Sequence, residues 1–192
     1  MQQWEEMEGF MIAEAERDLE AGDEIRPCFT AFAGENPLVL AFLRPFPKGG
    51  YHDPLIELIA LAAPLDADRL KLSISGRAWS MNDPIPPVDP DLGDLRQRVL
   101  QIESVDGAAG RSRRSSALHP YDVVDGTVRW GETMRLGGGE GWIPGALEIA
   151  VRKRRRLRAP LDEIRKQAER CVILGHLVAL GPTVVDRLQL TA

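Results

Sequence analysis

The sequence predicts an α+β domain in which a largely antiparallel sheet carries an N-terminal helix, one inserted helix and two C-terminal helices. Three observations predict it. Helical periodicity dominates both ends of the chain, strand segments come in runs joined by hairpin-type turns, and helices and strands do not strictly alternate. A doubly wound α/β fold, which needs that alternation, is the alternative. The length of 192 residues favours a single domain spanning 1–192.

The first element is an amphipathic helix over residues 3–21, followed by two strands. Apolar residues recur in the helix at three- and four-residue spacing, and Gly22 is a suitable residue just past its end. The other helix face is densely acidic. Strands are expected at 25–33 and 38–44, because both segments are rich in aromatic and aliphatic residues and the sequence Gly-Glu-Asn-Pro between them is typical of a hairpin turn.

The middle of the chain alternates a buried helix with further strands. Asp53 can cap a helix that has Pro54 at its first position and is stopped by Pro64. Alternation of apolar and polar residues predicts strands at 69–76 and 98–105, and Asp-Gly at 125–126 predicts a hairpin with arms 121–124 and 127–130. Proline, glycine, aspartate and serine content predicts flexible loops at about 80–94 and 106–117.

The C-terminal third is expected to be helical, with helices at 145–158 and 161–180 separated by Pro160 and a short final turn at 183–190. The longest apolar run, 171–180, has about half of the roughly 20 residues that a membrane helix needs, so it predicts a buried helix. Small residues at 168, 171, 175 and 179 would line one face of that helix and permit close helix packing, within the chain or between subunits.

Composition excludes some classes of protein. A formal net charge of −5 argues against a surface that is basic throughout and coats nucleic acid. The acidic start of the chain does not resemble a signal peptide. Cys28 and Cys171 lie in separate apolar segments, which predicts free buried thiols and a reducing compartment. We therefore expect a soluble, cytoplasmic protein without membrane partners.

Charge is strongly polarised along the sequence. Residues 152–170 contain nine basic and three acidic side chains, whereas residues 1–24 contain nine acidic side chains and one arginine. The basic run is a candidate binding face for nucleic acid or another polyanion, with a second basic cluster at 111–114. The candidate residues are Arg152, Lys153, Arg154, Arg155, Arg156 and Arg158. The alternatives are a solvated helix face or a face that meets the acidic first helix.

Known catalytic and cofactor motifs are missing from the sequence. The glycine-rich stretch 137–141 lacks the Gly-Lys-Ser/Thr of a P-loop and the third glycine of the dinucleotide fingerprint, so it is expected to be a plain connection. The spacing of histidines and cysteines does not fit a zinc site. No cofactor and no metal are predicted. A composite enzyme site near His52, His119 and Trp79 remains a possibility.

Trp79 and the proline- and aspartate-rich loop after it form a candidate ligand or partner cleft, with Asp83 among its acidic residues. The alternative is a tryptophan that closes the sheet edge. The sequence Ala67-Asp68-Arg69-Leu70 leading into a strand, followed by Trp79, this loop and a second strand, resembles small uncharacterised α+β proteins of bacteria and phages. The resemblance covers about a quarter of the chain and implies no activity and no site residues.

These observations support three hypotheses. The first is a non-enzymatic protein-binding or assembly module, with a second copy of itself or another protein as partner. The second is a nucleic-acid- or polyanion-binding protein that uses the basic helix at 152–158. The third is an enzyme with a composite site near His52, His119 and Trp79. The missing catalytic motif and the opposite charges at the two ends favour the first hypothesis.

Overall fold

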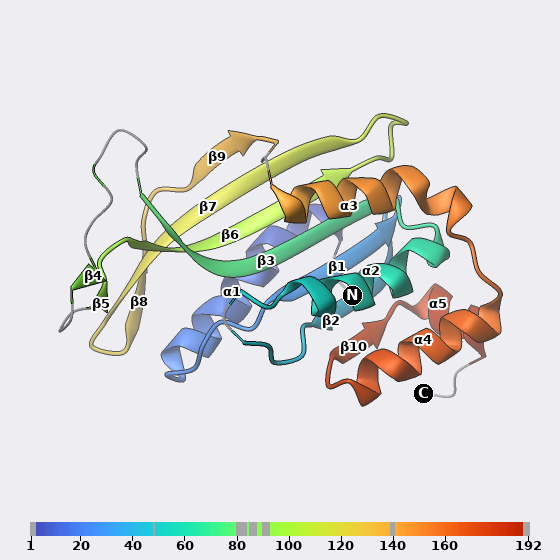
Figure 1. The fold of residues 1–192 in the computed structure, drawn as a ribbon, viewed down its shortest axis with the longest axis horizontal. Coiled ribbons are helices and arrows are strands. Elements are labelled where there is room, and N and C mark those ends of the chain that lie inside the picture. Colours follow the sequence, from blue (N-terminus) through green and yellow to red (C-terminus); the bar gives the residue numbers. More distant parts are fainter. Residues whose placement is uncertain are drawn as a thin grey trace.

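The protein is built on one curved antiparallel sheet, as a computed structural model shows (Figure 1). The structure describes residues 3–47, 49–79, 84, 88–89, 93–138 and 141–189. The sheet has eight strands. Along its main path they follow the order β10-β2-β1-β3-β6-β7-β8, and β9 pairs with β7 beside β8. Every ladder is antiparallel. The predicted α+β class is therefore confirmed, and the α/β alternative is wrong.

The first half of the chain supplies the centre of the sheet. Its elements are η1 (Trp4–Glu6), α1 (Met7–Glu20), β1 (Cys28–Ala33), β2 (Asn36–Phe42), α2 (His52–Ala62), η2 (Ala63–Leu65) and β3 (Arg69–Ala78). The second half adds β6 to β9 on one side of the sheet, β10 at the opposite edge, and the helices α3, α4 and α5. Its elements are β4 (Val88–Asp89), β5 (Gly93–Asp94), β6 (Gln97–Asp106), β7 (Arg113–Val124), β8 (Thr127–Trp130), β9 (Met134–Gly137), α3 (Trp142–Lys153), η3 (Arg154–Arg156), α4 (Leu161–Ile173), β10 (Leu177–Leu180) and α5 (Pro182–Leu188).

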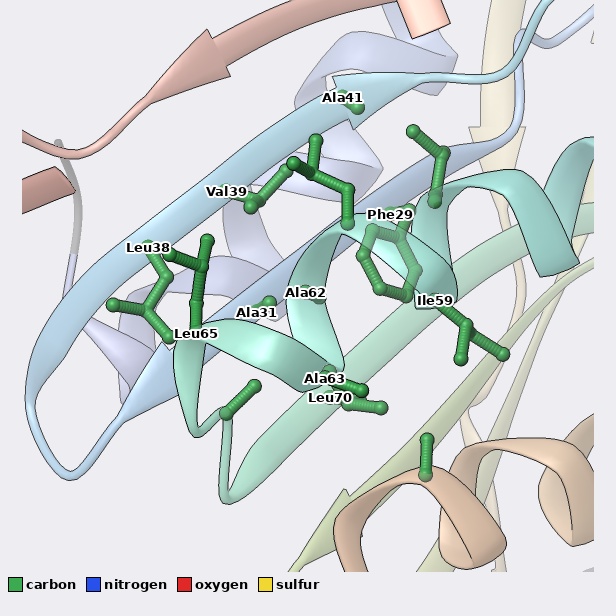
Figure 2. Packing of buried hydrophobic residues seen from close by; sticks show 14 of the residues in the cluster. Phe29, Ala31, Leu38, Val39, Ala41, Ile59, Ala62, Ala63, Leu65 and Leu70 are labelled. Atoms are coloured by element: carbon green, nitrogen blue, oxygen red, sulfur yellow. The ribbon is translucent and has the colours of Figure 1, made fainter. Parts of the chain in front are cut away.

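Helices cover both faces of the sheet and bury separate apolar clusters. Helices α2, α3, α4 and α5 pack on one face, where β1, β2 and β3 contribute Phe29, Val39 and Leu70 to the larger core (Figure 2). Helix α1 lies on the opposite face (Figure 1), where Met11 packs with Leu100 and other residues of the second core. The alternation of side chains along each strand therefore serves two cores.

The cysteines are free and buried, as the sequence predicts. Burial raises the pKa of the Cys171 thiol to about 11, and also raises the pKa of Cys28, so both thiols stay protonated at neutral pH. In the described part of the chain, no helix is both long enough and apolar enough to cross a membrane.

The prediction of one long helix over 161–180 is wrong. Helix α4 ends at Ile173, and Gly175 adopts φ 99°, a left-handed conformation that glycine accepts without a Cβ penalty. The His176 N–H donates to the Cys171 carbonyl at 3.0 Å, which closes the helix end. The rest of the apolar run becomes β10. Small residues at 175 and 179 are therefore not on a helix face.

Three other boundaries differ from the prediction. Residues 113–117, expected in a flexible loop, begin β7, because their side chains alternate across a strand paired with β6. Strand β9 was not predicted. Helix α3 begins at Trp142 rather than at 145 and ends at Lys153, where the chain tightens into a 3-10 turn. Most of the predicted 80–94 loop lies outside the described residues.

Candidate functional site

The two histidines of the predicted composite site lie on opposite faces of the sheet. His52 begins α2, where its ring centroid is 4.2 Å from that of Trp142 at the start of α3. His119 lies in β7 and points toward α1, where Glu8 is 3.6 Å away. The structure does not bring them together. Trp79 follows β3 and stacks with the Arg96 guanidinium at 5.4 Å, and Asp83 lies outside the described residues.

His119 is 4% exposed and forms part of a buried polar group beneath α1. Its Nδ1 lies 3.0 Å from the Thr133 hydroxyl, and desolvation lowers its pKa, which favours the neutral ring. A ring covered in this way does not face a substrate. Among the described residues, no cluster of His, Cys, Asp and Glu side chains is suited to hold a metal ion.

The acidic first helix does not cover the basic segment. Helix α1 lies on one face of the sheet, and the basic residues follow α3 on the other (Figure 1). Two of the six predicted polyanion-binding residues reach a carboxylate, since Arg154 lies 3.5 Å and Arg158 lies 2.9 Å from Asp66. Arg152, Lys153, Arg155 and Arg156 are exposed and form no ion pair with any described residue.

The sheet is open at β10. This strand pairs with β2 on one side, and no described strand pairs with its other side. The residues Leu-Val-Ala-Leu contain no charge and no proline, the devices that normally protect an edge strand. An edge of this kind is a template for a further strand.

A buried polar contact fixes β10 against the rest of the sheet. The Nε2 of His176 lies 2.8 Å from the Glu57 carboxylate in α2, and its Nδ1 accepts a hydrogen bond from the Arg44 backbone N–H at 3.1 Å. Arg44 also donates to Glu57, and this contact, with a smaller one from His176, lowers the pKa of the Glu57 carboxyl. His176 is thus a positioning residue for the edge.

An apolar groove runs beside the open edge, between α4 and β10. It encloses about 470 Å³ and is lined by Ala168, Glu169, Val172, Ile173, Val178 and Leu180. Two of its lining side chains are unusually exposed for aliphatic residues, with 84% for Ile173 and 57% for Val172. Leu177 in β10, which alternates to the other face of the sheet from Val178, is 60% exposed. A strand edge and an apolar groove side by side are the features of a protein-binding surface.

Sequence reasoning missed this surface because it assigned residues 174–180 to a helix. The available signal was Gly175, which follows a periodic helical segment and is a typical residue just past a helix end. Comparison of the chain with protein-family models, with curated proteins and with solved structures finds no match.

Proposed function

We propose that this protein is a non-enzymatic assembly module that pairs with a second copy of itself through β10. The observation that carries the proposal is the open, uncharged edge of β10 beside the α4–β10 groove. The occupant of such an edge is a strand, because only a strand can pair its unpaired N–H and C=O groups in register.

The hydrogen bonds of the ladder define the register of the proposed pairing. The Gly181 N–H donates to the Leu38 carbonyl at 2.9 Å, so Ala179 and Leu177 also direct their backbone groups toward β2. Val178 and Leu180 then direct theirs outward. A two-fold axis through Ala179, perpendicular to the sheet, pairs Val178 of one copy with Leu180 of the other. Both residues are hydrogen-bonded in that arrangement.

The same symmetry operation makes the groove self-complementary. Val178 and Leu180 line the groove in each copy, so the two grooves meet on one face of the joined sheet and the two α4 helices approach each other there. Exposed Val172 and Ile173 at the rim of one copy face the groove of the other. The small Ala179 side chains meet at the axis, where strands come closest.

Charge favours a second copy of this chain as the occupant. Glu169 lines the groove, Arg170 follows it in sequence, and neither forms an ion pair with any described residue. Antiparallel α4 helices offer each of them the opposite charge of its symmetry mate.

Apolar burial is of the right order to support the association. Full burial of an aliphatic side chain stabilises by about 1.5–3 kcal/mol. Val172, Ile173 and Leu177 contribute from both copies, which offsets the cost of association, about 4–15 kcal/mol.

Sedimentation equilibrium and light scattering test the proposal. The 192-residue chain at about 100 µM should have twice its 21.2 kDa mass. The Ile173→Glu variant should be a monomer of unchanged circular dichroism. As a matched control, Ile149→Glu changes an isoleucine of α3 that is 55% exposed and should leave the dimer intact. A monomeric wild type, or equal dissociation by the two variants, would overturn the proposal.

A second variant tests the strand pairing itself. Val178→Pro removes an outward N–H without removing a donor to β2, and proline is tolerated on edge strands in that orientation. It should raise the dissociation constant of the dimer at least tenfold, while the unfolding midpoint of the monomer changes little. A dimer of unchanged affinity would mean that β10 is not the interface.

A further inference from the structure

A polar hollow lies beside the basic segment 152–158, which the sequence predicts to be a polyanion-binding face. It encloses about 400 Å³ and is lined by Gly107, Gly110, Ser112, Val151, Arg152, Arg154 and Arg155. Two parts of the sequence about forty residues apart meet there, the β6–β7 loop and the end of α3 with η3. The second basic cluster predicted from the sequence, at 111–114, is therefore placed beside the first.

Close backbone packing fixes the loop that forms one wall of the hollow. A Cβ on Gly107 would be 2.3 Å from Val151 Cγ1, so only glycine lets the loop lie this close to α3. The Gly107 N–H donates to the Asp68 carbonyl at 2.8 Å, and the Ala108 N–H donates to Asp106 at 2.9 Å. The wall is therefore in place before any ligand binds.

The other side of the loop is fastened by Glu148 of α3. Its carboxylate accepts hydrogen bonds from the Ser112 hydroxyl and from the Arg114 guanidinium, which together lower the pKa of Glu148. This acidic residue is therefore engaged by its own neighbours. On the opposite side, Arg154 is oriented by its 2.8 Å hydrogen bond to the Val151 carbonyl.

Around the hollow, cations outnumber the carboxylates available to neutralise them. The exposed basic residues that form no ion pair with any described residue are Arg111, Arg113, Arg152, Lys153, Arg155 and Arg156. The nearby carboxylates of Asp66, Asp106 and Glu148 are each already paired with arginine. The concave basic surface concentrates positive potential toward the arginines that line it.

We infer that this hollow is a binding site for linked phosphates. Guanidinium groups bind phosphate oxygens in a bidentate manner, and the flanking cations extend the site beyond a single phosphate. Among the described residues, no aromatic side chain lines the hollow, so these residues offer bases no surface on which to stack. Recognition is therefore of the phosphate chain, whether as inorganic polyphosphate or as the backbone of a nucleic acid. This site is independent of the β10 edge.

Fluorescence anisotropy with a labelled 20-nucleotide single-stranded RNA tests the site, and calorimetry with inorganic tripolyphosphate provides a second arm. If about three phosphates are engaged, raising the salt from 50 to 200 mM should weaken RNA binding about 20-fold. Tighter binding of tripolyphosphate would identify a polyphosphate source, and tighter binding of RNA a nucleic-acid source. Both outcomes support a phosphate site, and no binding of either probe at 20 mM salt would overturn it.

A matched pair of double variants separates the hollow from general electrostatic attraction. Arg152→Gln with Arg155→Gln should weaken binding of both probes at least tenfold. Arg129→Gln with Arg187→Gln removes the same charge from exposed positions in β8 and α5 and should change affinity less than threefold. Equal losses in the two double variants would show that the hollow is not the site. The dimer mass should be unchanged in both.

Discussion

The acidic first helix and the basic segment after α3 look equivalent in sequence, but the fold uses them in different ways. Three of the five carboxylates of α1 are paired within the chain, Glu8 with Arg135 at 2.6 Å, Glu14 with Arg17 at 2.7 Å and Asp18 with Arg26 at 2.7 Å. Most cations of the basic segment have no ion-pair partner among the described residues. A dense charge run therefore shows little by itself about its role. What decides is whether the fold places the opposite charge beside it.

The comparison predicts that removing an α1 carboxylate costs far more than removing a basic side chain. Asp18 is 5% exposed and accepts hydrogen bonds from the Arg26 backbone N–H at 2.9 Å and from its guanidinium. Asp18→Ala leaves these donors without an acceptor and should lower the free energy of unfolding by about 2–3 kcal/mol. Urea denaturation measures it, with the exposed Glu20→Ala as a control. If Asp18→Ala lowers the free energy of unfolding no more than Glu20→Ala does, the Asp18 carboxylate is merely solvated.

The loop beside the basic segment is held by close backbone packing at Gly107 in addition to its contacts with Glu148, and a substitution at Gly107 tests the packing. Gly107→Ala places a methyl group against Val151 and should destabilise the protein by about 2 kcal/mol. In a Val151→Ala background the same change should cost less, because the methyl group has room. A double-mutant cycle by urea denaturation measures the coupling. Additive effects would mean that the loop moves away from α3 instead.

Most of the fold could be predicted from the sequence because its signals are local. The hairpin at Asp125-Gly126 follows from turn chemistry within a few residues and is present. The predicted Asp53 cap of α2 is wrong, because the helix already begins at His52, Tyr51 precedes it without a side-chain cap hydrogen bond, and Asp53 lies inside its first turn. The failure at 174–180 has a different cause. A short run with no polar residue except His176 has neither helical nor strand periodicity, so its structure is decided by the tertiary contacts of His176 and β2.

The candidate sites were less predictable than the fold. Basic residues at 152–156 were visible in the sequence, but the hollow needs the loop around Gly110, and only the packing of β6 and β7 against α3 brings the two together. Similarly, nothing local indicates that residues 177–180 form the last strand of the sheet. Sites built by long-range contacts have no local signature.

The pH dependence of stability is expected to report the paired carboxylates of α1. Hydrogen bonding to Arg135 lowers the pKa of Glu8 below its usual value of 4.5. A lowered pKa stabilises the fold above the unfolded value, and this contribution disappears as the pH falls through the folded value. Glu8→Gln should therefore cost up to about 1 kcal/mol at pH 6 and almost nothing at pH 3, as measured by urea denaturation. A cost independent of pH would assign the loss to packing.

The smallest effect is expected at the unpaired cations. Arg152, Lys153, Arg155 and Arg156 are exposed, lie close together in sequence and form no ion pair with any described residue, and among these four only Arg152 interacts with the Glu148 carboxylate. Removing Arg155 or Arg156 relieves repulsion and breaks no ion pair within the described residues. Arg155→Ala or Arg156→Ala should change the free energy of unfolding by less than about 0.5 kcal/mol, in the stabilising direction at low salt.

Arg158→Ala provides the internal comparison for that measurement, because Arg158 bonds to Asp66 at 2.9 Å and its loss should be mildly destabilising. The stabilising effect of Arg155→Ala or Arg156→Ala and the destabilising effect of Arg158→Ala should both shrink toward zero as salt screens the charges. If Arg155→Ala and Arg156→Ala are as destabilising as Arg158→Ala, these cations have structural partners, and the contrast with α1 fails. If they are neutral or stabilising while phosphate binding falls, the unpaired charge is maintained for a ligand at some cost to the fold.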